Sequence, residues 1–214
     1  MNLTIFLLSL LLSVQSAFAA EIDDQTGHWV GTFVNKPMSE RFSVWAESQI
    51  RFNHDIGGVQ QVLYRTGVLQ RLSAESGIGY LYAFIQTGGQ KEHRLTLQHT
   101  QHYGSFINMT WSHRLRAETR FLERNSDSAG RVRYLVRGEG LDVLGTSLVI
   151  WDECFFNLTR EDWTGNQFTE RNRFFLGLRQ KVSETHFEFG YLNQYVPRSS
   201  LNIMEHLLVL YIFI

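Results

Sequence analysis

The sequence predicts an all-β fold, an antiparallel up-and-down transmembrane β-barrel of about ten strands, with twelve strands as the alternative count. Three observations support this prediction. Apolar and polar residues alternate with a period of two, several of the alternating stretches run for twelve residues or more, and short connections alternate with longer ones. A period of two separates side chains onto the opposite faces of a strand, whereas a helix would scatter them around its circumference.

The alternating stretches follow one another along the chain with no helical segment between them. The first, at residues 28–34, is short. The second, at residues 41–52, carries Phe42 and Val44 on one side and Arg41 on the other. The later candidates are residues 60–72, 75–86, 92–102, 107–121, 131–139, 146–157, 168–181, 183–195 and 203–214. Strands in uninterrupted series predict an antiparallel meander.

The alternation is clearest at residues 107–121 and poorest at residues 146–157. In the clearest stretch, odd positions are mainly apolar, as at Trp111, and every even position is polar, as at Arg114. In the poorest stretch, Asp152 falls on an otherwise apolar face. We expect both stretches to be strands.

The connections between the stretches predict the two ends of the barrel. Tight connections fall at residues 72–75, 103–105, 142–145 and 181–184, and longer ones at residues 53–59, 86–91, 125–130, 158–167 and 197–202. Transmembrane barrels have short periplasmic turns and long external loops, and bacterial single-chain barrels have an even number of strands. Counting back from the C-terminus gives ten strands beginning near Arg41. Residues 28–34 are then either a partial strand or part of a count of twelve.

Alternation alone does not show which face is outside. A soluble lipocalin-like barrel or a sandwich has the same period with its apolar faces inward. Two features favour the membrane-spanning barrel: 17 of the 20 basic residues are arginine, which suits pairing across a lumen, and the strands exceed the usual five to six residues. We therefore expect apolar faces to contact lipid, and aromatic residues such as Trp29, Trp111 and Tyr211 to lie in the wall and its interfacial girdles.

The N-terminal segment predicts export. An apolar run from Leu3 to Val14 is followed by Ala17-Phe18-Ala19, a small-x-small pattern typical of a signal-peptidase site. We expect residues 1–19 to be a cleaved signal peptide and residues 20–214 to form a single barrel domain in the bacterial outer membrane. The alternative is an N-terminal membrane anchor, although the apolar run is shorter than the roughly 20 residues that a membrane span needs.

Several short sequence motifs lie in these strands. Trp29 precedes an acidic-x-Gln-x-Arg strand at residues 47–51, and residues 113–121 read His-Arg-Leu-Arg-Ala-Glu-Thr-Arg-Phe. Further motifs are residues 92–95, 131–134, 153–157, 171–173 with Gly177, and 190–195. Together they resemble the bacterial outer-membrane barrel family catalogued as domain of unknown function 2490, across residues 28–214. The resemblance implies location and architecture but no activity. One departure is Ile214, where such barrels usually end in an aromatic residue.

With the apolar faces toward lipid, the lumen would receive a network of arginine and glutamate. Its predicted members are Glu47, Arg51, Arg65, Arg94, Arg114, Arg116, Glu118, Arg120, Arg133, Arg137, Glu153, Arg171 and Arg173. One interpretation is a packed network in a structural or surface-binding barrel. A second is a small passive pore, in which the excess of arginine would favour anions. A third is a lipid-modifying barrel enzyme.

Other functions find little support in the sequence. The net charge of −1 gives no basic excess for nucleic acid, and the single cysteine excludes a cysteine-rich zinc site. His99 and His102 would point to opposite strand faces, and the Gly-x-Ser-x-Gly motif is absent. We expect a monomer that is not an enzyme and holds no cofactor or metal. Its expected partners are outer-membrane lipid and the export and barrel-assembly machinery.

Overall fold

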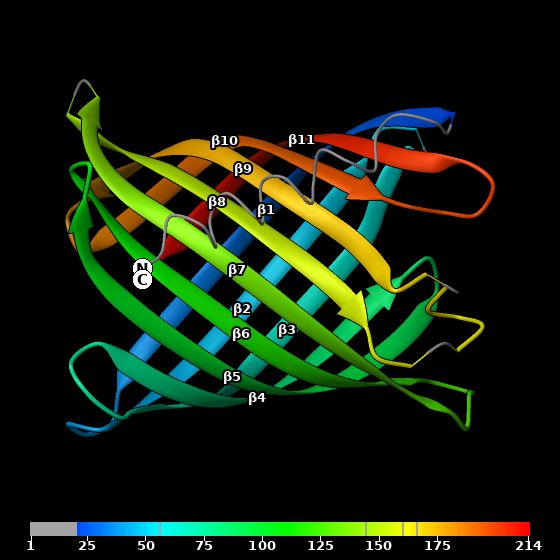
Figure 1. The fold of residues 1–214 in the computed structure, drawn as a ribbon, viewed down its shortest axis with the longest axis horizontal. Coiled ribbons are helices and arrows are strands. Elements are labelled where there is room, and N and C mark those ends of the chain that lie inside the picture. Colours follow the sequence, from blue (N-terminus) through cyan, green and yellow to red (C-terminus); the bar gives the residue numbers. More distant parts are fainter. Residues whose placement is uncertain (1–20, 56, 144, 160, 166) are drawn as a thin grey trace.

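The computed structural model describes residues 21–214 except residues 56, 144, 160 and 166. The predicted signal peptide, residues 1–19, lies outside this described part. Within it the chain forms eleven strands that close into one barrel (Figure 1). In the same residues, no helix is long and apolar enough to cross a membrane.

The eleven strands follow one another around the barrel in chain order. Their bounds are β1 Ile22–Pro37, β2 Phe42–Asn53, β3 Gly58–Arg71, β4 Ser76–Thr87, β5 Gln90–Phe106, β6 Met109–Leu122, β7 Ser128–Val143, β8 Thr146–Asn157, β9 Thr169–Val182, β10 Thr185–Val196 and β11 Asn202–Phe213. All consecutive pairs are antiparallel, which confirms the predicted all-β meander.

The predicted count of ten strands, or twelve, is wrong because the barrel closes through a parallel pair. Residues 28–34 belong to β1, a full strand of 16 residues. Strand β1 pairs with β2 on one side and runs parallel to β11 on the other, from Ile22 opposite Asn202 to Phe33 opposite Phe213. An even count requires the first and last strands to be antiparallel, whereas a parallel closure gives an odd number. Figure 1 shows β1 in blue beside β11 in red.

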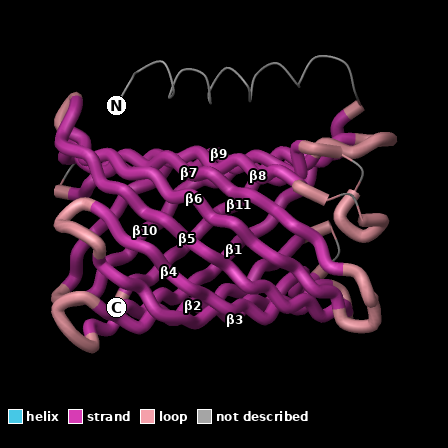
Figure 2. The backbone as a smooth tube through the Cα atoms, turned by 60° about the horizontal axis from the view of Figure 1, so that its bottom comes forward, coloured by secondary structure: helices cyan, strands magenta, loops and turns pink. Residues whose placement is uncertain are grey.

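The connections lie at two ends of the barrel (Figure 2). We call the end with Ile214 the turn end; its connections are residues 38–41, 72–75, 107–108, 144–145 and 183–184. We call the other the loop end; its connections are residues 54–57, 88–89, 123–127, 158–168 and 197–201. The longest connection, residues 158–168, is at the loop end, as the sequence suggested.

Two predicted connections differ in the structure. The expected loop at residues 86–91 is a tight turn, because Gly88 and Gly89 adopt the positive φ angles, 53° and 84°, that a two-residue hairpin turn needs. The expected turn at residues 103–105 is instead an irregularity within β5, where the register to β6 shifts between His102 and Ser105. The chain reverses two residues later, between Phe106 and Met109.

The two faces of the barrel differ in chemistry. Large apolar residues on the outside are exposed, for example Leu208 at 69% and Tyr80 at 60%, whereas the charged residues Glu118 and Arg116 inside are each 3% exposed. On the outer face of β8, Asp152 accepts hydrogen bonds from Asn172 Nδ2 to both carboxylate oxygens at 3.1 Å. This cross-strand contact explains how β8 tolerates an aspartate there.

One wall of the lumen is apolar, contrary to the expectation that apolar residues line only the outside. Residues of β1, β7, β8, β9, β10 and β11 form this apolar wall: Trp29, Phe33, Leu135, Val149, Trp151, Phe175, Leu192, Leu207, Val209 and Tyr211. Trp29 and Tyr211, expected in the outer wall and girdles, therefore belong to the interior. Alternation could not place Tyr211, because β11 is apolar on both faces from Leu207 onward.

Candidate functional site

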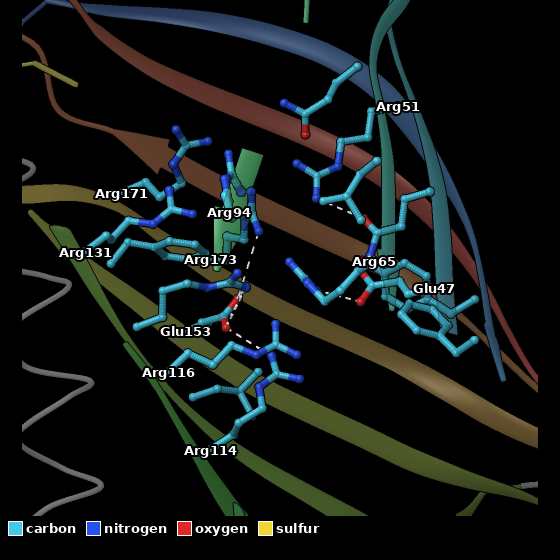
Figure 3. A pocket seen from close by; sticks show the side chains of 18 of the residues that line it. Glu47, Arg51, Arg65, Arg94, Arg114, Arg116, Arg131, Glu153, Arg171 and Arg173 are labelled. Carbon is cyan, nitrogen blue, oxygen red and sulfur yellow. Dashed lines mark hydrogen bonds and ion pairs between the residues drawn. The ribbon is translucent and has the colours of Figure 1, made fainter. Parts of the chain in front are cut away.

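The candidate site is a cavity of about 410 Å³ inside the lumen. Twelve arginines and four glutamates line it. Its lining includes Gln90 and Trp163 toward the loop end and Phe33 and Phe213 toward the turn end. Figure 3 shows arginine side chains from several strands converging on this space.

The structure brings the predicted lumen residues together. Twelve of the thirteen line the cavity: Glu47, Arg51, Arg65, Arg94, Arg114, Arg116, Arg120, Arg133, Arg137, Glu153, Arg171 and Arg173. The remaining one, Glu118, is buried against Arg131 and Arg133, which line the cavity themselves. All thirteen are inward-facing because each occupies the polar set of alternating positions in its strand.

A network of carboxylates and arginines crosses the middle of β6, β7 and β8. Glu118 stands opposite Arg131 in the register, and its Oε2 accepts from Arg131 Nε at 2.9 Å while its Oε1 accepts from Arg133 Nη1 at 2.9 Å. Arg133 Nη2 then donates to both oxygens of Glu153 at 2.9 Å, and Arg114 Nη2 reaches Glu153 at 3.0 Å. Because each buried carboxylate meets at least two arginines, the network satisfies its charges mutually.

A second network lies toward the loop end. Glu92 accepts from Arg94 Nε and from Arg120 Nε, each at 2.6 Å. Glu170 accepts from Arg131 Nη1 at 2.6 Å and from Arg171 Nη2 at 2.9 Å. Four arginines thus share two carboxylates in this part of the lumen, and Arg131 joins it to the network around Glu118.

Further ion pairs lie near the turn end and on the wall formed by β2 and β3. Arg137 Nη2 donates to Glu188 at 2.6 Å and to Glu139 at 2.8 Å. On the other side, Arg65 Nη1 donates to Glu47 Oε2 at 2.6 Å. These pairs are short charge-assisted hydrogen bonds, which are stronger than neutral ones.

Three lumen arginines are held by neutral amides instead. Each donates one hydrogen bond to a glutamine Oε1: Arg51 Nη2 to Gln49 at 2.8 Å, Arg116 Nε to Gln98 at 2.8 Å, and Arg173 Nε to Gln194 at 2.6 Å. Among the described residues, no carboxylate forms an ion pair with Arg51 or Arg116, and the one paired with Arg173 is 3.9 Å away, on Glu153. An amide fixes the orientation of a guanidinium group without neutralising its charge.

Aromatic side chains line the cavity toward the turn end. Phe33 packs against Trp45, Tyr211 and Phe213 with ring centroids 5.8, 5.2 and 4.8 Å apart. The guanidinium of Arg179 lies 4.8 Å from the centre of the Phe213 ring, a cation–π contact. The lumen therefore changes from charged to aromatic on one side as it approaches this end.

Sequence reasoning missed several lumen residues. Arg131, Arg179 and Glu92 line the cavity and share the alternating positions of Arg133, Arg173 and Arg94, so the same pattern could have found them. Glu170 carried no such signal. It lies where the register between β8 and β9 shifts, and the extra residue turns its carboxylate inward beside Arg171.

The outer face carries histidine–tyrosine pairs. Tyr82 and His93 are joined by a hydrogen bond of 2.6 Å, and Tyr103 and His113 by one of 2.9 Å. The described residues contain no group of three or more histidine, cysteine, aspartate or glutamate side chains arranged to hold a metal ion. The buried charged side chains of the described residues gather in the arginine-rich lumen.

Comparison with known proteins identifies a family for this chain. The model of a protein family of unknown function, DUF2490, matches residues 26–205, which is most of the chain. No curated protein and no solved structure matches. The matched range runs from within β1 to the first residues of β11, so it includes β2 to β10, whereas Tyr211 and Phe213, the cavity-lining residues of β11, lie beyond it. The chain belongs to the DUF2490 family of proteins of unknown function.

Proposed function

We propose that the protein is an outer-membrane β-barrel that spans the bilayer. It encloses an arginine-rich lumen in which most of the charged side chains form ion pairs that stabilise the barrel. The observation that carries this proposal is the distribution of side chains. Leu95, Leu97, Tyr80 and Leu208 are at least half exposed on the outer wall, while the charged side chains are buried inside. This arrangement matches a barrel whose surroundings are lipid.

The outer surface argues against a barrel in water. Soluble monomers rarely expose contiguous apolar patches larger than a few hundred Å². Here outward apolar side chains lie on adjacent strands at similar heights; Leu97 of β5, for example, is opposite Tyr80 of β4. Lipid acyl chains would cover such a surface without cost. Outer-membrane lipid and the export and barrel-assembly machinery are then the expected partners, and the chain needs no catalytic group.

The location can be tested by expressing the full chain in a Gram-negative bacterium and separating its membranes. We expect the protein in the outer-membrane fraction, resistant to extraction by alkaline carbonate, with an electrophoretic mobility that changes on heating in detergent. A variant with Gly27→Pro, placed in β1 between β2 and β11, serves as the misfolding control and should lose the mobility change. Recovery of the wild-type protein in the periplasm would overturn the proposal.

A second candidate function is a small passive pore that prefers anions. The observation that favours it is the cavity itself, whose lining reaches toward both ends and holds twelve arginines against four glutamates. An excess of fixed positive charge lowers the electrostatic barrier to anions. Planar-bilayer recordings in a salt gradient test this function: small steps with an anion-selective reversal potential would support it. A folded barrel that shows no conductance would exclude the pore function and favour the barrel with a packed lumen.

A further inference from the structure

Two of the amide-held arginines meet on one aromatic ring. Arg51 lies 4.0 Å and Arg173 lies 4.9 Å from the centre of the Trp29 ring, and both guanidinium groups line the cavity. They come from β2 and β9, on opposite sides of β1 in the barrel order. Trp29 is 2% exposed, so it forms a fixed platform for the two charges.

Neither charge has a full counter-ion. The partner of Arg51 is the neutral amide of Gln49, and its Nε atom is buried with no hydrogen-bond partner among the described residues. Arg173 donates to Gln194, and in the described part of the chain its one paired carboxylate, on Glu153, is 3.9 Å away. The two residues are 8% and 6% exposed. Buried charges are normally paired or hydrogen-bonded to a counter-charge, so this pair leaves a charge to be balanced.

The surroundings increase the positive charge. Arg94 and Arg171 lie within electrostatic range of Arg51, and Arg171 is also near Arg173. Their nearest carboxylates are already shared, because Glu92 also binds Arg120 and Glu170 also binds Arg131. Glu47 and Glu153 act on Arg51 and Arg173 in the opposite sense, but they are hydrogen-bonded to Arg65 and Arg133 respectively. Figure 3 shows Arg51, Arg94, Arg171 and Arg173 around the same part of the cavity.

We propose that Arg51 and Arg173, seated on Trp29, form a binding site in the lumen for a compact oxyanion with two or more negative charges. Planar guanidinium groups match the oxygen spacing of phosphate and carboxylate, and each can offer two parallel donors. The glutamines hold both groups in position while leaving their charge available. This site goes beyond the proposed membrane location, and it requires the closed barrel but not ion conduction.

The test measures oxyanion binding to the purified, folded protein in detergent. Pyrophosphate and citrate are titrated separately at constant ionic strength, with chloride as the monovalent control, by isothermal titration calorimetry and tryptophan fluorescence. We expect saturable binding of at least one multivalent anion and none of chloride. A response to pyrophosphate alone assigns the site to phosphate groups, and a response to citrate alone assigns it to carboxylates.

Substitutions separate this site from the general charge of the lumen. R51Q and R173Q should each weaken binding by about tenfold or more, because each removes a charge-assisted contact. R137Q is the matched control: it also removes a lumen arginine, but one whose partners Glu188 and Glu139 keep Arg179 beside them and do not contact Arg51 or Arg173. Its affinity should stay within about twofold of wild type, since no contact of the site is lost.

Stability in the absence of ligand gives a second readout. Since Arg51 lacks a counter-ion, R51Q should fold and resist urea at least as well as the wild-type protein. The proposal is overturned if neither anion binds saturably, if R137Q weakens binding as much as R51Q, or if R51Q cannot fold in anion-free buffer. Binding of a multivalent anion without any conductance would support the oxyanion site and exclude the pore function.

Discussion

Among the described residues, the arginines of this lumen fall into two groups, those that form an ion pair with a carboxylate and those that do not. Arg131 represents the first group: it is 2% exposed and contacts both Glu118 and Glu170. Arg51 represents the second, with a neutral glutamine and a tryptophan ring as its partners. A residue of the first group stabilises the barrel through its partners, so its removal leaves another buried charge unpaired.

Removing the carboxylate of Glu118 should destabilise the barrel strongly. E118A would leave Arg131 and Arg133 each without one of their carboxylates, and breaking a buried pair of this kind costs about 3–5 kcal/mol. The urea midpoint of unfolding, followed by the heat-modifiable gel shift, measures the loss.

The control for this prediction is Glu123 at the loop end. It pairs with Lys91 at 3.4 Å, and both side chains are nearly half exposed. E123A should therefore change stability by less than about 1 kcal/mol. Equal midpoints for E118A and E123A would show that the buried network does not hold the barrel together.

At the scale of strands, two glycines, Gly177 of β9 and Gly190 of β10, pack closely against the apolar wall. This packing sets how closely β9 and β10 lie together. A side-chain carbon at Gly177 would lie 2.5 Å from the Phe175 ring and 2.5 Å from the backbone oxygen of Phe189. Gly190 is opposite Gly177 in the register and is as closely confined. Phe175, fully buried, fills the space that the two glycines leave.

Adding one methyl group at Gly177 should therefore be costly. We expect G177A to lower the free energy of unfolding by about 1–3 kcal/mol, because the backbone of Phe189 must shift to accommodate it. The matched control is G58A in β3, where an added carbon would meet nothing within 4 Å. Chemical denaturation of both variants tests the packing, and an unchanged stability in G177A would contradict it.

The alternation of apolar and polar residues predicted the antiparallel strands and most of the residues that face the lumen. On β6 and β2, one face is charged and the other apolar, so alternation alone assigned Arg116, Glu118 and Arg51 to the interior. The same rule failed in β11, which is apolar on both faces, and at Glu170, which a register shift turns inward. The parallel closure of β1 on β11 leaves no local pattern, since it depends on contacts between the two ends of the chain.

The parallel closure predicts a specific crosslink. Val30 of β1 is opposite Leu210 of β11, and both side chains point outward. In a Cys154→Ala background, the V30C/L210C pair should react with a thiol crosslinker that spans the roughly 5 Å between neighbouring strands. V30C/L176C is the control, because Leu176 lies on β9, beyond β10 and β11. A folded V30C/L210C protein that fails to crosslink would contradict the count of eleven strands.

At the scale of the whole molecule, the barrel is apolar outside and charged inside. This is the reverse of a soluble domain, in which burial of apolar area drives folding in water. Here one apolar wall and the paired arginines and glutamates surround the cavity in the interior, and under the proposed function the outer surface would face lipid. The arginine excess then gives the lumen the positive character on which both the pore and the oxyanion site depend.

The most direct test of this account compares two adjacent residues of β6 in lipid vesicles. Leu115 is 45% exposed on the outer wall, whereas Arg114 lines the cavity. In the Cys154→Ala background, L115C and R114C are labelled unfolded with an environment-sensitive fluorophore and refolded into vesicles that contain a quencher on the lipid chains. We expect strong quenching at position 115 and little at position 114. Equal quenching at both positions, or quenching only at position 114, would contradict it.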